Sequence, residues 1–170
     1  MTDARRIHEA FESGDLEGVS CALEDPSTFP NGWVPALRTC PLEYAIYHSP
    51  LPFIRTLIEL GADPNYQDEG SFPSLLAALS TDREDRHQLL ETLLAAGASL
   101  EQRGVNDYTP LHYAATRNDA AAVELLLARG ADPSARTRID DRTTPLEEAE
   151  RLKCQEAVRA LKRAPHRAGG

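Results

Sequence analysis

A short phrase that recurs along the chain constrains this sequence more than any other feature. It reads ELGADPN at 59–65, AAGASLE at 95–101 and ARGADPS at 128–134. The spacing between successive copies is 36 and then 33 residues, measured at their glycines, Gly61, Gly97 and Gly130. A phrase that returns at a nearly constant period is typical of a repeat array, whose copies stack to bury a shared core. We therefore expect an array rather than a single globular fold.

A second phrase alternates with the first. It reads CPLEYAI at 40–46, FPSLLAA at 72–78, TPLHYAA at 109–115 and TPLEEAE at 144–150. Thr109 can cap a helix with its side-chain oxygen, and Pro110 suits the first helical position, where no backbone donor is needed. Asn118 and Gly130 tolerate the left-handed conformation that ends many helices. Each copy thus predicts a short helix, a turn and a second helix.

These phrases resemble the ankyrin repeat family. The resemblance rests on TPLHYAA, on VELLLARGADPS (123–134) and on a 20-residue offset that separates Pro110 from Gly130 and also Pro41 from Gly61. It implies an all-α solenoid of about five helix-turn-helix units with β-turn fingers, in which the fingers and first helices line a concave face. We expect one domain over 1–163 with a frayed tail at 164–170, and units at about 7–25, 39–63, 71–99, 108–132 and 144–163. The first and last units should be polar caps.

The histidine of the TPLH phrase is the residue most easily taken for a catalyst. The resemblance implies instead that His112 bonds across the turn region and steadies neighbouring units. The same position holds other residues elsewhere in the chain: His8, Glu43, Leu75 and Glu147. A catalytic base would not need such a position in every unit, so we expect His112 to be structural.

No catalytic or metal motif accompanies this histidine. The sequence has no nucleophile elbow, no phosphate-binding glycine loop and no metal-ligand spacing of His or Cys. We therefore expect no enzyme activity, no cofactor and no metal. A second hypothesis is an enzyme accessory that binds a small molecule, with His48 or Cys40 near a pocket.

Two segments depart from the repeat pattern. Residues 26–39 form a long connection with three prolines and the only tryptophan, so Trp33 and Phe29 are either exposed anchors or fold back over the N-terminal units. Residues 80–88 carry a charged insertion of four residues. We expect this insertion to extend the second helix by a turn, with Thr81 or Asp82 as its cap, and the alternative to a role in binding is that the extension is merely solvated.

The resemblance also implies which side chains face a partner. Aromatic and arginine residues are enriched in interfaces. The expected partner-binding residues are Trp33, Tyr47, His48, Tyr108, Arg117 and Arg151. Tyr44 and Tyr113, one helical turn earlier, should pack between units. The paired acids Glu147 and Glu148 should lie on a solvated face.

Charge narrows the class of partner. The net charge is -9, and because residues 151–170 sum to +5, the rest of the chain sums to -14. An acidic body repels phosphate backbones, so we expect no nucleic acid and a single, basic protein partner.

The cysteines and the hydropathy indicate the compartment. Cys21, Cys40 and Cys154 are scattered, which predicts three buried thiols in a reducing cytoplasm rather than a disulfide framework. No secretory leader or membrane-spanning run is visible, and we expect a cytoplasmic protein that is monomeric when free.

The function that fits best is a non-enzymatic protein-binding module. With no second domain visible, binding itself would be the output, which suits an inhibitor, an immunity-type protein or an adaptor. A scaffold subunit of a larger complex is the alternative. Arginine outnumbers lysine, which is typical of a GC-rich genome, and we expect a bacterial source.

Overall fold

The computed structural model describes residues 3–23, 26–66, 72–139 and 141–163. Within these ranges the regular structure consists of ten α-helices and two short 3-10 turns. The only extended pairing among these residues is a single antiparallel bridge between Val34 and Thr39. The prediction of an all-α fold is therefore confirmed.

The chain forms two compact parts, residues 1–99 and 100–170. Helices in the first part come as three pairs: α1 (Asp3–Ser13) with α2 (Leu16–Ala22), α3 (Pro41–His48) with α4 (Leu51–Glu59), and α5 (Ser74–Ser80) with α6 (Arg86–Ala95). Those in the second part come as two: α7 (Pro110–Thr116) with α8 (Ala120–Ala128), and α9 (Pro145–Arg151) with α10 (Gln155–Arg163). The 3-10 turns are η1 (Pro26–Thr28) and η2 (Val105–Asp107). We number the five pairs as repeats 1 to 5.

The helices begin and end for the reasons that the sequence indicates. The side chain of Thr109 accepts a hydrogen bond from the backbone of His112, and Thr144 forms a reciprocal capping box with Glu147. Asn118 ends the first helix of its repeat at φ 55°, and Gly130 ends the second at φ 97°. A side chain at Gly130 would be strained by this conformation alone, because a Cβ there would meet no neighbouring atom.

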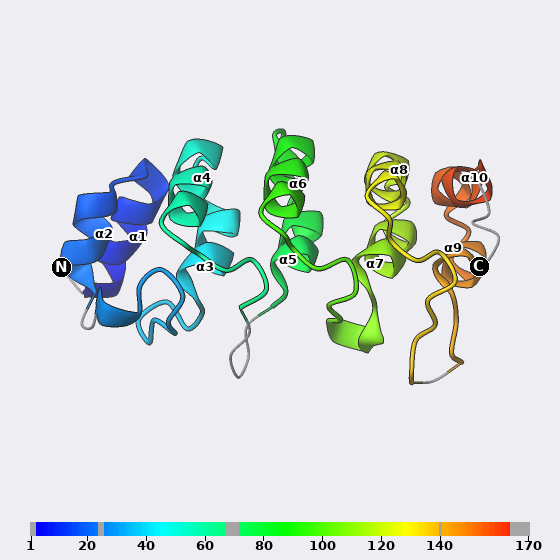
Figure 1. The fold of residues 1–170 in the computed structure, drawn as a ribbon, viewed down its shortest axis with the longest axis horizontal. Helices are drawn as coiled ribbons and strands as arrows, with labels where there is room; N and C mark the ends of the chain where they lie inside the picture. Colours follow the sequence, from blue (N-terminus) through cyan, green and yellow to red (C-terminus); the bar gives the residue numbers. More distant parts are fainter. Residues whose placement is uncertain (1–2, 24–25, 67–71, 140, 164–170) are drawn as a thin grey trace. The chain divides into compact units, whose positions relative to one another are not determined.

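The core of each part lies between successive repeats. In the first part α1 packs on α3 and α3 on α5, while in the second part α7 packs on α9 and α8 on α10. Figure 1 shows α4 and α6 of the first part, and α8 and α10 of the second part, at the edge away from the connecting fingers. Large side chains fill these contacts and are fully buried: Phe11, Ile46, Leu57, Leu90, Leu111 and Leu126. A lone pair of such short helices could not bury this surface, so neighbouring repeats must stack.

The long connection at 26–39 contains the first finger of the array. Asn31 donates a hydrogen bond from Nδ2 to the carbonyl of Gly61 at 2.9 Å and accepts one from the backbone N–H of Asp63 at 2.6 Å. Asn65 makes the same two bonds to Gly97 and Ser99, at 2.9 and 2.7 Å. Asn31 lies 34 residues before Asn65, which is about one repeat. The connection therefore follows the repeat pattern from Pro30 onward, and its extra residues lie before Pro30.

We expect Leu126→Ala to lower the free energy of unfolding by about 2–5 kcal/mol, because Leu126 is fully buried in α8. Chemical denaturation followed by circular dichroism measures this change. Leu152→Ala is the matched control, since Leu152 is exposed and should lose little. Equal effects of the two changes would mean that the stacking register is wrong.

Candidate functional site

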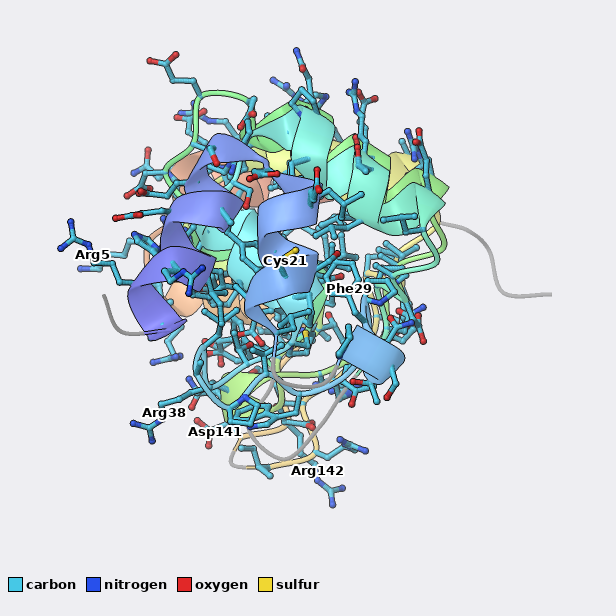
Figure 2. All side chains as sticks on the ribbon, turned by 90° about the vertical axis from the view of Figure 1, so that its left-hand side faces the viewer. Arg5, Cys21, Phe29, Arg38, Asp141 and Arg142 are labelled. Carbon is cyan, nitrogen blue, oxygen red and sulfur yellow. The ribbon has the colours of Figure 1, made fainter. Side chains whose placement is uncertain are left out.

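Trp33 lies in the first finger and is half-buried, as is Phe29, while the neighbouring Pro30 and Val34 are buried. The half-burial of both rings agrees with either sequence hypothesis for this segment. The tip of the finger is exposed at Arg38, whose side chain points away from the ribbon in Figure 2.

The first helices of repeats 1 and 2 gather an aromatic and histidine cluster. His8 Nδ1 lies 2.6 Å from the hydroxyl of Tyr44, and the ring of His48 lies 4.3 Å from that of Tyr44 and 5.2 Å from that of His8. Tyr44 also packs edge-on against the buried Phe11, so its predicted place between repeats is confirmed. We name His8, Tyr44, Tyr47 and His48 the α3 cluster.

Two members of the α3 cluster were predicted partner contacts, and both are accessible. Tyr47 is 42 % exposed, and its hydroxyl lies 3.0 Å from Ser80 Oγ at the end of α5. His48 is exposed at the end of α3, and partial burial together with the nearby His8 lowers its pKa. The α3 cluster therefore presents aromatic rings and a neutral His48 ring at pH 7.

The charged insertion at 80–88 turns one side chain, Arg83, inward, whereas Asp82, Glu84, His87 and Gln88 are exposed. Helix α6 begins only at Arg86, so the extra residues form a loop, and the predicted helical extension from Thr81 or Asp82 is wrong. The guanidinium of Arg83 donates to the carbonyls of Ile46 and Ser49, at 3.2 and 2.6 Å, and pairs with Asp85. Only 17 % of the Arg83 side chain is exposed. This arginine satisfies carbonyls that the end of α3 leaves without a helical partner.

His112 has the structural role that the sequence indicates. Its Nε2 lies 3.0 Å from the carbonyl of Thr143 in the next finger, and its Nδ1 lies 2.8 Å from Thr109 Oγ1. Because a carbonyl can only accept, Nε2 carries the proton. Burial lowers the pKa of His112, so the ring stays neutral. Glu43 fills the same position in repeat 2 and accepts from the backbone N–H of Phe72.

The remaining predicted contacts lie in repeats 4 and 5. The ring of Tyr108 stacks on that of His112 at 5.6 Å, with 7° between the planes. Arg117, just after α7, and Arg151, at the end of α9, are both exposed. Tyr108 and Arg151 line one cleft of about 490 Å³, which we name the finger cleft, whereas Arg117 lies outside it. Its lining residues are Asn106, Tyr108, Thr137, Asp141, Thr143, Glu148 and Arg151.

Glu148 is buried at the base of this cleft, so its predicted place on a solvated face is wrong. Its side chain is 7 % exposed, and its carboxylate accepts from Thr143 Oγ1 at 2.6 Å and from Arg151 at 2.5 and 3.1 Å. Burial by itself would raise the pKa of Glu148, but the bonds from Thr143 and Arg151 outweigh it and lower the pKa. The adjacent Glu147 is exposed, as predicted.

An ion pair between the two fingers was not anticipated from the sequence. The carboxylate of Asp107 accepts from the backbone N–H and the guanidinium of Arg138, both at 2.6 Å, and from Arg103 at 2.9 Å. Hydrogen bonding from Arg138 is the largest cause that lowers the pKa of Asp107 to about 2. The two positions are 31 residues apart, and only the repeat register brings them together.

Three further sequence predictions can be compared with the described residues. Cys40 and Cys154 are buried but Cys21 is exposed on α2 (Figure 2), so the expectation of three buried thiols is wrong for Cys21. No group of histidine, cysteine, aspartate and glutamate in the described ranges could hold a metal ion. No helix in those ranges is long and apolar enough to cross a membrane.

Comparison with known families agrees with this geometry. The profile described as ankyrin repeats (3 copies) matches residues 75–167, more than half of the chain, and the profile described as ankyrin repeats (many copies) matches residues 42–94. The chain therefore belongs to the ankyrin repeat family. Repeats of this family are in general protein-interaction modules.

Similar proteins contain the repeat within much longer chains. Transient receptor potential channel pyrexia of Drosophila melanogaster is 32 % identical over 121 residues, which are 71 % of this chain and 12 % of that protein. Alpha-latroinsectotoxin-Lt1a of Latrodectus tredecimguttatus is 30 % identical over 112 residues, 65 % of this chain and 8 % of the toxin. L-asparaginase of Dirofilaria immitis is 39 % identical over 77 residues, 45 % of this chain and 12 % of the enzyme. The chain thus corresponds to only 8 to 12 % of the length of these proteins.

We expect Arg83→Ala to lower the free energy of unfolding by about 1–3 kcal/mol, because two carbonyls at the end of α3 lose a charged donor. Denaturant titration measures the change. Arg55→Ala is the matched control, since Arg55 is exposed on α4. A neutral Arg83→Ala variant would contradict the inward role of Arg83.

We expect Asp107→Asn to cost about 1–2 kcal/mol at pH 7, because the amide cannot replace the charged acceptor for Arg138 and Arg103. The lowered pKa means that the carboxylate stabilises the fold above about pH 4, its unfolded range, and that this contribution is lost as the pH falls toward 2.

Unfolding measured from pH 7 to pH 2 checks this second expectation. The wild type should lose more stability on acidification than Asp107→Asn does. Asp141→Asn is the control, because Asp141 is exposed and should change stability little at any of these pH values. Parallel pH profiles for wild type and Asp107→Asn would contradict the role of this ion pair.

Proposed function

We propose that this protein is a non-enzymatic binding module that engages one protein partner through its finger and first-helix surfaces. The observation that carries the proposal is that accessible aromatic, histidine and arginine side chains lie on the first helices and fingers of the repeats. In each part the first helices and fingers present accessible side chains: Tyr47 and His48 in the first part, and Tyr108, Arg117 and Arg151 in the second. Aromatic and arginine side chains of this kind are enriched in interfaces and in their energetic centres.

Pre-organisation supports these elements as the binding surface. The finger at 136–143 is fixed by the bond from Thr137 N–H to the Thr143 carbonyl and by the Asp107–Arg138 pair. The α3 cluster is held by ring contacts and by the Tyr44 bond. Surfaces that are already ordered lose little conformational entropy on binding. Trp33 extends the proposed surface to the first finger.

The charge of the chain supports a basic partner. The acidic balance of residues 1–150 would speed the encounter with a cationic surface and disfavour nucleic acid. We propose that the module is monomeric when free, acts in a reducing compartment such as the cytoplasm, and works by occlusion as an inhibitor, an immunity-type protein or an adaptor. A scaffold role would differ only in what the partner does once bound.

Affinity capture from a lysate of the source organism, read by mass spectrometry, tests the proposal. The wild type is compared with Tyr47→Ala/His48→Ala/Arg117→Ala, which changes only accessible side chains of the proposed surface. The control, Arg55→Ala/Leu60→Ala/Glu124→Ala, changes exposed side chains of the opposite edge. We expect one stoichiometric protein that the control retains and the surface variant loses by about tenfold or more, since three contact residues are removed.

Other outcomes would redirect or end the proposal. A partner lost only by the control variant would move the interface to the second helices. A partner retained by both would place it elsewhere, and a complex with no change in the partner's activity would favour the scaffold role. No partner at all would contradict the binding function.

A further inference from the structure

We propose that the finger cleft is a binding site for an arginine side chain of the partner. This inference rests on the proposed function and names the chemistry of one subsite. The cleft is formed by the fingers of repeats 4 and 5 and by α9, all within the second part of the chain. Its volume of about 490 Å³ is ample for one long side chain.

The cleft holds a carboxylate, that of Asp141, which pairs with no other residue that the structure describes. Asp141 is exposed at its rim and makes no hydrogen bond or ion pair with any residue in the described ranges. Figure 2 shows its side chain at the outer end of the finger. The other lining charges are Glu148 and Arg151, which pair with each other, so the formal charge of the lining is -1. A cationic ligand is therefore favoured electrostatically.

An anionic ligand is disfavoured although Arg151 lines the cleft. Nε and Nη2 of Arg151 already bond the buried carboxylate of Glu148. An anion that drew Arg151 away would leave Glu148 buried with no cation beside it, which is costly in a protein interior. The same pair shows that this lining accepts a guanidinium: Arg151 bonds Glu148 by two nitrogens at the edge of the cleft.

The shape and stiffness of the lining favour arginine over lysine. A guanidinium can bond Asp141 through two nitrogens at once, which an ammonium cannot do. The aromatic ring of Tyr108 offers a surface for the planar cation and is held in place by its stacking on His112. Thr143 donates from its backbone N–H to Thr137 Oγ1 and from its hydroxyl to Glu148, so the site is formed before a ligand arrives.

Nuclear magnetic resonance titration of the full chain with N-acetyl-L-arginine amide tests the site without the partner. We expect saturable shifts confined to the cleft, at Tyr108, Asp141 and Thr143, with a dissociation constant on the order of millimolar, as suits a single side chain. N-acetyl-L-lysine amide should bind several-fold more weakly, and N-acetyl-L-glutamate amide should give no saturable shift.

Two charge-matched variants decide which carboxylate matters. Asp141→Asn should weaken the arginine probe by about fivefold, the usual effect of losing one exposed ion pair. Glu124→Gln removes the same charge from the exposed face of α8 in the same part and should leave the affinity unchanged. Unchanged unfolding curves would show that both variants remain folded.

Several outcomes would overturn the inference. The inference is wrong if the arginine probe gives no saturable shift, or if its shifts lie outside the cleft. It is also wrong if Asp141→Asn and Glu124→Gln weaken binding of the arginine probe equally, or if the lysine probe binds as tightly as the arginine probe. Because the probe needs no partner, such a failure leaves the captured complex and the proposed function untouched. Conversely, a cleft that binds the probe while no partner is captured would contradict the binding function alone.

Discussion

The structure depends on hydrogen bonds that one repeat makes to the backbone of the next. Short helices of seven to eleven residues cannot hold their own fingers in place, and the buried leucines specify stacking but not register. Register is fixed by polar side chains with defined partners: Asn31, Glu43, Asn65, His112 and Asn118. Each bonds a backbone group about one repeat further along. The fingers, and with them the proposed binding surface, therefore follow from these few contacts.

Much of this arrangement could be predicted from the sequence because it repeats. The helix starts at Pro41, Pro110 and Pro145 and the left-handed turn at Gly130 follow from local chemistry that recurs in each unit. The role of His112 could be inferred because the same position is occupied by unrelated residues elsewhere. The first finger was missed because its phrase, Pro30–Asn31, lacks the glycine that precedes the other copies.

The site was harder to predict because its geometry arises between repeats. Tyr108 and Arg151 were expected at the surface, but nothing local shows that they share a cleft. A glutamate such as Glu148 is expected to face solvent, and its burial is explained by the hydrogen bonds that its carboxylate accepts from Thr143 and Arg151. Arg83 likewise lies in a run of charges that suggests solvent, yet it bonds carbonyls 34 and 37 residues earlier. Pairwise contacts at such separations leave no signal in a single sequence.

Several of the bonds between repeats run forward along the chain, whereas Arg83 reaches back to the end of α3. Asn31 and Asn65 each reach forward to the turn of the following repeat, and Asn118 accepts from the backbone of α10. During synthesis each of these asparagines is therefore made before the backbone segment to which it bonds. Each repeat that leaves the ribosome can dock on side chains already displayed by its predecessor, without waiting for the end of the chain. Such forward contacts favour stepwise folding that begins at the N-terminal repeats.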